Sequence, residues 1–72
     1  MPTYRLLRAT RVVVTTDGQP ELLTIPEGSI ITVHEPPSTE TGLVPIRWES
    51  RTVKMFMVDL ERRAQLVDEA VN

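Results

Sequence analysis

Side chains capable of catalysis are few in this chain, and they are scattered. His34 is the only histidine among 72 residues, and no nucleophile or orienting acid stands at a readable spacing from it. Ser50 lacks the Gly-x-Ser-x-Gly context of an activated serine. Asp59 and Glu61 resemble a carboxylate pair, but favourable charge at the start of a helix explains both. We therefore expect no catalytic residue, no metal and no cofactor.

Arg47, Lys54 and Phe56 are the candidate binding residues. They belong to an expected hairpin within residues 42–60, whose turn we centre on Ser50-Arg51. In that register Arg47 directly opposes Lys54 on the outer face, and like charges in this position are mildly destabilising. The pair indicates an acidic group across it, which is an internal carboxylate, a neighbouring subunit or an anionic partner. We favour the internal carboxylate, because structural ion pairs are common on surfaces.

The same register gives this hairpin one apolar face and one polar face, as a half-buried antiparallel pair requires. Six apolar residues share the inner face, in the pairs Trp48 with Val53, Ile46 with Met55 and Val44 with Met57.

The first half of the chain also reads as strands and tight turns. Strand-like segments cover residues 4–7, 11–15 and 29–34. Asp17-Gly18 predicts a two-residue hairpin turn that sets Val12 opposite Leu23 and Val14 opposite Glu21. Pro20 lacks an N–H and belongs at an edge or beside the turn. Residues 35–41 are polar and contain proline, which is typical of an exposed loop.

Residues 59–71 change to a helical period. Leu60, Ala64, Val67 and Val71 recur at helical spacing, which predicts a C-terminal helix over this range. Asp59 is the expected N-cap, and Arg62 and Arg63 stand at the right spacing to pair weakly with it.

Composition limits the function classes. Apolar residues make up 40% and charged residues 25% of the chain, which suits one small globular domain over residues 1–72. The net charge is −2 and Lys54 is the only lysine, so nucleic-acid binding is disfavoured. No apolar run is long enough for a membrane span. The absence of cysteine excludes disulfides and zinc–thiolate sites, and we expect a reducing cytoplasm.

The segment Leu23 to Val33 resembles the diverging turn of SH3-type barrels, and residues 42–60 resemble their distal hairpin and closing turn. The resemblance covers about Val12 to Leu60 and implies a small antiparallel barrel of about five strands with a C-terminal helix. The aromatic residues that line the SH3 peptide groove have no counterpart at Val12–Thr16 or at Leu60, so SH3-type peptide recognition is not implied. Small uncharacterised bacterial proteins share this general plan.

A second resemblance is to type II plasmid-borne dihydrofolate reductases, which are tetrameric SH3-like barrels around a central pore. Their Val-Gln-Ile-Tyr run corresponds here to Val53-Lys54-Met55-Phe56, in which only Val53 is identical. This resemblance implies a tetramer that binds a nicotinamide cofactor.

We interpret the chain as an all-β, SH3-like, non-enzymatic accessory or protein-interaction module of the bacterial cytoplasm. Its partner is an unidentified protein or a second copy of the chain. Two alternatives stay open. One is a nucleic-acid-associated protein that uses Arg47 and Lys54 with Arg5, Arg8 and Arg11, and the other is the pore-type reductase.

Overall fold

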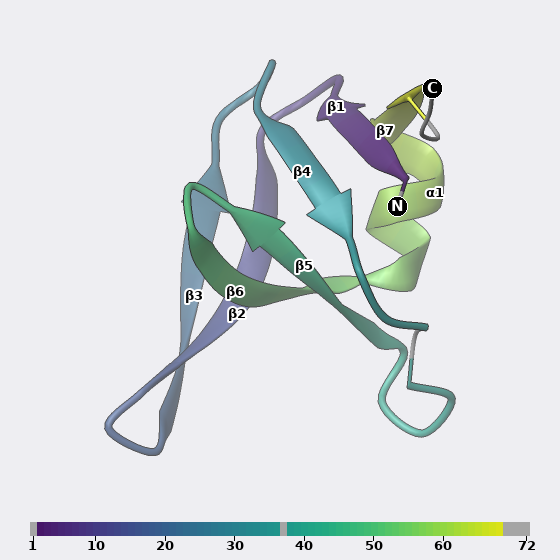
Figure 1. Ribbon diagram of the computed structural model, residues 1–72. Coiled ribbons are helices and arrows are strands. Elements are labelled where there is room, and N and C mark those ends of the chain that lie inside the picture. Colours follow the sequence, from purple (N-terminus) through teal and green to yellow (C-terminus); the bar gives the residue numbers. More distant parts are fainter. Residues whose placement is uncertain (1, 37, 69–72) are drawn as a thin grey trace.

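The computed structural model describes residues 2–36 and 38–68, which form seven strands and one short helix (Figure 1). All strand pairs are antiparallel, so the expected all-β class with one short helix is confirmed. The order across the sheet is β3-β2-β6-β5-β4-β1-β7. The elements are β1 (Thr3–Leu6), β2 (Thr10–Thr16), β3 (Gln19–Ile25), β4 (Ile30–Val33), β5 (Leu43–Trp48), β6 (Arg51–Phe56), α1 (Met57–Arg63) and β7 (Ala64–Asp68).

The expected closed barrel of about five strands is wrong, because the described sheet has seven strands and two free edges, β3 and β7. Strand β1 pairs with β4 on one side and with β7 on the other. Both of its hydrogen-bonding sides are therefore occupied, and none is left to close the sheet against β2 or β3. Pro20 lies on the edge strand β3, as predicted from its missing N–H.

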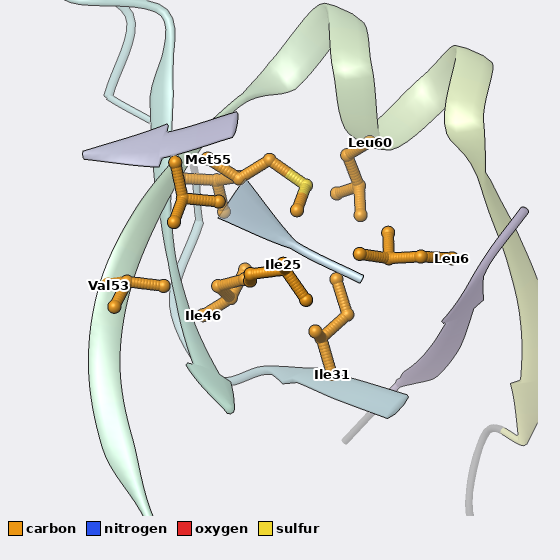
Figure 2. Packing of buried hydrophobic residues seen from close by; sticks show 9 residues of the cluster. Leu6, Ile25, Ile31, Ile46, Val53, Met55 and Leu60 are labelled. Carbon is orange, nitrogen blue, oxygen red and sulfur yellow. The ribbon is translucent and has the colours of Figure 1, made fainter. Parts of the chain in front are cut away.

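The open sheet curls around one hydrophobic core. Leu6 of β1 and Ile25 of β3 belong to the same buried cluster, although four strands separate β1 from β3 in the sheet. Leu60 of α1 points into the same interior (Figure 2). The nine buried apolar residues are Leu6, Val12, Ile25, Ile31, Val44, Ile46, Val53, Met55 and Leu60.

The β2–β3 hairpin confirms the predicted register. Val12 opposes Leu23 and Val14 opposes Glu21, with Asp17 and Gly18 as the turn. Both turn residues have positive φ, 53° and 78°, which is the geometry that Asp-Gly favours in a two-residue turn.

The β5–β6 hairpin has the predicted faces but a register shifted by two residues. Its turn is Glu49-Ser50 rather than Ser50-Arg51, so Arg47 opposes Thr52 and Lys54 opposes Pro45. The expected direct opposition of Arg47 and Lys54 is therefore wrong. A shift of two leaves every side chain on its original face, because side chains alternate with a period of two. Val44, Ile46, Val53 and Met55 are buried as predicted.

The C-terminal helix predicted over residues 59–71 is wrong over half of the described part of its length: residues 59–63 are helical, and residues 64–68 are not. Helix α1 ends at Arg63, and Ala64–Asp68 forms β7 against β1. Residues 69–71 lie outside the described residues. Residues 64–68 instead pair with the second side of β1. This tertiary pairing outweighs the local helical preference that the spacing of the apolar residues indicated. Helix α1 also starts earlier than predicted: its N-cap is Phe56, and Asp59 lies inside the first turn.

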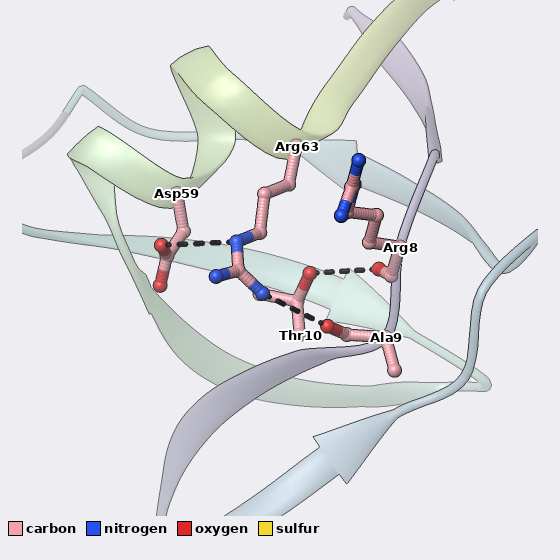
Figure 3. Close-up of polar contacts among 5 residues, drawn as sticks. All are labelled: Arg8, Ala9, Thr10, Asp59 and Arg63. Carbon is pink, nitrogen blue, oxygen red and sulfur yellow. Dashed lines mark hydrogen bonds and ion pairs between the residues drawn. The ribbon is translucent and has the colours of Figure 1, made fainter.

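Arg63 fastens α1 to the segment between β1 and β2 (Figure 3). Its Nη1 donates to the Ala9 carbonyl at 3.2 Å, and its Nε lies 3.7 Å from Asp59 Oδ1. The pairing expected between Asp59 and Arg63 is thus confirmed. The Thr10 hydroxyl donates to the Arg8 carbonyl at 2.9 Å and holds the same segment from the β2 side. Over residues 2–36 and 38–68, no helix is long and apolar enough to cross a membrane.

Candidate functional site

The charges on the outer face of the sheet are the first feature of the candidate site. In a strand, residues that neighbour a buried residue point to the opposite face. Across β3, β2, β6 and β5, the charged residues on this outer face are Arg11, Lys54 and Arg47, and all three are exposed. This face is therefore positive in a chain whose net charge is −2.

Acidic residues are concentrated elsewhere. Most of the described ones lie in the turns and loops between strands or on α1, namely Asp17, Glu27, Glu35, Glu40, Glu49, Asp59 and Glu61. Glu21 lies within β3, opposite Val14, and so belongs to the inner-facing register. The segregation leaves the outer face of the central strands without a negative charge of its own.

Phe56 is the aromatic side chain of this face, and its side chain is 41% exposed. Val12 and Val13 of β2 pair with Met55 and Lys54 of β6, so Arg11 and Phe56 are the next residues where this pairing ends. On its other side, Phe56 pairs with Leu43. The aromatic ring thus stands between cationic and apolar neighbours.

Apolar side chains continue the face toward its β3 edge. Leu22, which is 63% exposed, pairs with Val13, and Val13 pairs with Lys54. We call the group Arg11, Val13, Leu22, Arg47, Lys54 and Phe56 the outer-face patch. All three predicted binding residues belong to it.

Within the described residues, the internal carboxylate expected beside Arg47 and Lys54 forms no ion pair with either of them, although Glu35 lines the same pocket as Arg47. In the part of the chain that the structure describes, the ion pair is Asp59–Arg63, and neither Arg47 nor Lys54 has an acidic group within ion-pairing distance. The two cations are diagonal neighbours on paired strands, which sets them about 7–8 Å apart. Repulsion between them is therefore weaker than in the predicted register, and their free charge faces outward.

A pocket of ≈ 250 Å³ opens beside Arg47. It lies where β4 ends at Val33 while β5 continues, and its lining residues are His34, Glu35, Pro45, Ile46, Arg47 and Thr52. His34 is exposed and lies just past the end of β4.

A second, wider depression of ≈ 500 Å³ lies between α1 and the β2–β3 hairpin. Ala9, Arg11, Thr24, Asp59 and Arg63 line it. Asp59 and Arg63 are already paired with each other here, so Arg11 is the cation with free charge in this depression. Through Arg11, this depression connects the outer-face patch with Asp59 and Arg63 of α1.

The remaining candidate residues are not brought together. Ser50 stands at the tip of the β5–β6 turn, while Asp59 and Glu61 lie on α1. Among the residues described, no group of three or more His, Asp or Glu side chains could hold a metal ion. In the run that resembles the reductase strand, Val53 and Met55 are buried in the core, and only Lys54 and Phe56 face outward.

Comparison of the chain with protein-family models, with curated proteins and with solved structures finds no match.

Proposed function

We propose that this chain is a non-enzymatic interaction module whose outer-face patch docks an acidic, partly apolar segment of a partner protein. The observation that carries the proposal is the positive charge of Arg11, Arg47 and Lys54 on the same outer face that exposes the ring of Phe56. Charge complementarity selects and orients a partner, and aromatic residues with arginine supply much of the binding energy at interfaces. We also propose that residues 12–60 are related to SH3-like barrels and that the protein acts in a bacterial cytoplasm.

An acidic segment fits this face better than a purely charged ligand does. Leu22 and Val13 extend the patch with apolar surface next to Lys54. Apolar surface rimmed by polar groups is typical of protein docking sites. A partner segment that alternates acidic and apolar residues would satisfy both parts of the patch at once.

The test uses a dye-labelled peptide of alternating glutamate and leucine, followed by fluorescence anisotropy. We expect Lys54→Glu and Phe56→Ala each to weaken binding roughly tenfold, because charged hydrogen bonds and interfacial aromatic residues each contribute more than about 1.4 kcal/mol. The matched control is Arg62→Glu on α1, which makes the same charge change on an exposed residue away from the patch. Equal weakening by Lys54→Glu and Arg62→Glu would refute a defined docking face.

One observation favours a second candidate, which is binding of single-stranded nucleic acid. Phe56 lies beside Arg11 and near Lys54, and an aromatic ring flanked by cations is how such proteins stack bases and hold phosphates. Three phosphate contacts predict a slope of about −2 in log affinity against log salt for a single strand. If an oligonucleotide binds with this slope and displaces the acidic peptide, the nucleic-acid function replaces the protein-docking function.

A further inference from the structure

The pocket beside Arg47 lies where β4 and β5 diverge. The Val33 N–H donates to the Pro2 carbonyl at 3.0 Å, so Val33 turns its backbone groups away from β5. Thr32 is paired with Arg47 and Val33 with Ile46, and β4 ends at Val33. Pro45, the next β5 residue whose N–H position would face β4, has no N–H. The sheet can open here without leaving a backbone donor unpaired.

Three side chains at this opening can donate hydrogen bonds and one can only accept. Arg47, His34 and Thr52 supply a guanidinium, a ring N–H and a hydroxyl, while Glu35 supplies a carboxylate. Pro45 adds an apolar wall. With the histidine neutral, the formal charges of Arg47 and Glu35 cancel. A pocket of this kind suits an anion of single charge that carries a hydrogen-bond donor beside it, and it disfavours a doubly charged phosphoryl group.

The volume of the pocket limits what it can hold. At about 30 Å³ for each water in the liquid, a volume of ≈ 250 Å³ corresponds to about eight waters. Pockets for drug-sized ligands run from about 300 to 1,000 Å³. The pocket therefore fits one side chain or one chain terminus rather than a cofactor.

We propose that this pocket binds a carboxylate presented by the docked partner segment, with the planar guanidinium of Arg47 as its main ligand. The inference rests on the proposed docking function, since Arg47 belongs to both the outer-face patch and the pocket. Arginine forms a two-pronged contact with carboxylates that lysine does not reproduce. Glu35 accepts the peptide N–H next to the bound carboxylate, so the pocket recognises an acidic residue within a peptide.

The experiment is an NMR titration of the ¹⁵N-labelled full chain with small blocked probes. N-acetyl-glutamate N-methylamide carries a side-chain carboxylate, and N-acetyl-alanine carries a terminal one. We expect N-acetyl-glutamate N-methylamide to shift the backbone amides of His34, Arg47 and Thr52. Shifts caused by N-acetyl-alanine alone would show that the pocket takes a chain end and would overturn an acidic residue within a peptide as its ligand. The neutral control, N-acetyl-glutamine N-methylamide, should leave these amides in place. Equal shifts with the neutral probe would overturn the proposal.

Two variants of Arg47 distinguish the effect of its charge from that of its planar guanidinium. Arg47→Gln should weaken binding of the active probe roughly tenfold, and Arg47→Lys should restore less than half of the lost affinity in log units, since it keeps the charge and loses the fork. Arg62→Gln on α1 makes the same charge change away from the pocket and should change affinity less than twofold. Full rescue by Arg47→Lys, or equal loss in Arg62→Gln, would overturn the carboxylate pocket.

Failure of this inference is distinguishable from failure of the docking function. If the alternating peptide binds and depends on Lys54 and Phe56 while the small carboxylates shift nothing at the pocket, the pocket proposal is overturned and the docking function stands. If the alternating peptide fails to bind, the docking function fails, whatever the small probes do.

Discussion

The turn between β5 and β6 carries two strained residues, and relieving them should stabilise the protein. Glu49 and Ser50 have φ of 51° and 68°, in the left-handed region that side chains disfavour. Each such residue costs roughly 1–2 kcal/mol. Replacement of Ser50 by glycine offsets part of this gain, because the added entropy of glycine lowers the free energy of the unfolded chain by about 0.4–1 kcal/mol. We expect Glu49→Asn/Ser50→Gly to raise the free energy of unfolding by about 1 kcal/mol. For a domain of this size that raises Tm by about 4–8 °C.

A matched variant moves the same turn sequence one residue along the chain. In Ser50→Asn/Arg51→Gly the glycine falls on the strand position opposite Trp48, where it should cost about 0.5–1 kcal/mol. Thermal unfolding followed by circular dichroism measures both variants. The structure predicts that the first gains and the second loses stability. The reverse order would place the turn at Ser50-Arg51 and would refute the register, together with the neighbours of Arg47 and Lys54 that follow from it.

Further predictions concern the core, one turn and the helix. Met55→Ala empties a fully buried position and should lower the free energy of unfolding in urea by about 2–5 kcal/mol. Leu22→Ala at the exposed edge should change the same free energy by less than about 0.5 kcal/mol. Similar losses in the two variants would contradict the assignment of inner and outer faces. Gly28→Ala should cost about 1–2 kcal/mol in the same assay through its φ of 87° alone, since an added Cβ meets nothing within 4 Å, and an unchanged stability would be inconsistent with this turn. A double-mutant cycle over Asp59 and Arg63 should give a coupling below about 0.5 kcal/mol, because Arg63 is exposed, Asp59 is only partly buried and their charged atoms lie 3.7 Å apart. A coupling above about 1 kcal/mol would mean that the pair is shielded from solvent.

The two hairpins show which parts of the fold the sequence could predict. Asp17-Gly18 is a specific turn signal, because both residues tolerate positive φ, and it fixed the β2–β3 register correctly. Glu49-Ser50 carries no such signal, so the β5–β6 register was predicted two residues away. The inner and outer faces survived this error because only an odd shift exchanges them. That is why Arg47, Lys54 and Phe56 were correctly expected on the outer face.

The C-terminal segment shows where sequence periodicity misleads. Leu60, Ala64 and Val67 recur at helical spacing, yet only Leu60 is buried and Val67 is 44% exposed. The decisive interaction is the pairing of residues 64–68 with β1, which lies about sixty residues away in the sequence. A local pattern does not contain that contact.

The pocket could not be predicted either, for a related reason. It depends on where β4 ends relative to β5, and no single residue type marks that point. Pro45 was the available signal, since a proline inside a strand implies that one of its neighbours leaves the ladder there. Arg11 belongs to the patch through the β2–β6 pairing, which joins residues about forty positions apart.

The most direct test of the account is the NMR footprint of the alternating glutamate–leucine peptide on the labelled full chain. We predict that the shifted amides cluster on the central strands, at Arg11–Val13 of β2, Leu43–Arg47 of β5 and Thr52–Phe56 of β6, with the β2–β3 turn and α1 unaffected. A footprint confined to β7, α1 or the acidic turns would contradict the claim that the positive outer face is the docking surface. A saturable footprint on the predicted strands that disappears in Lys54→Glu and persists in Arg62→Glu is the result that the account requires.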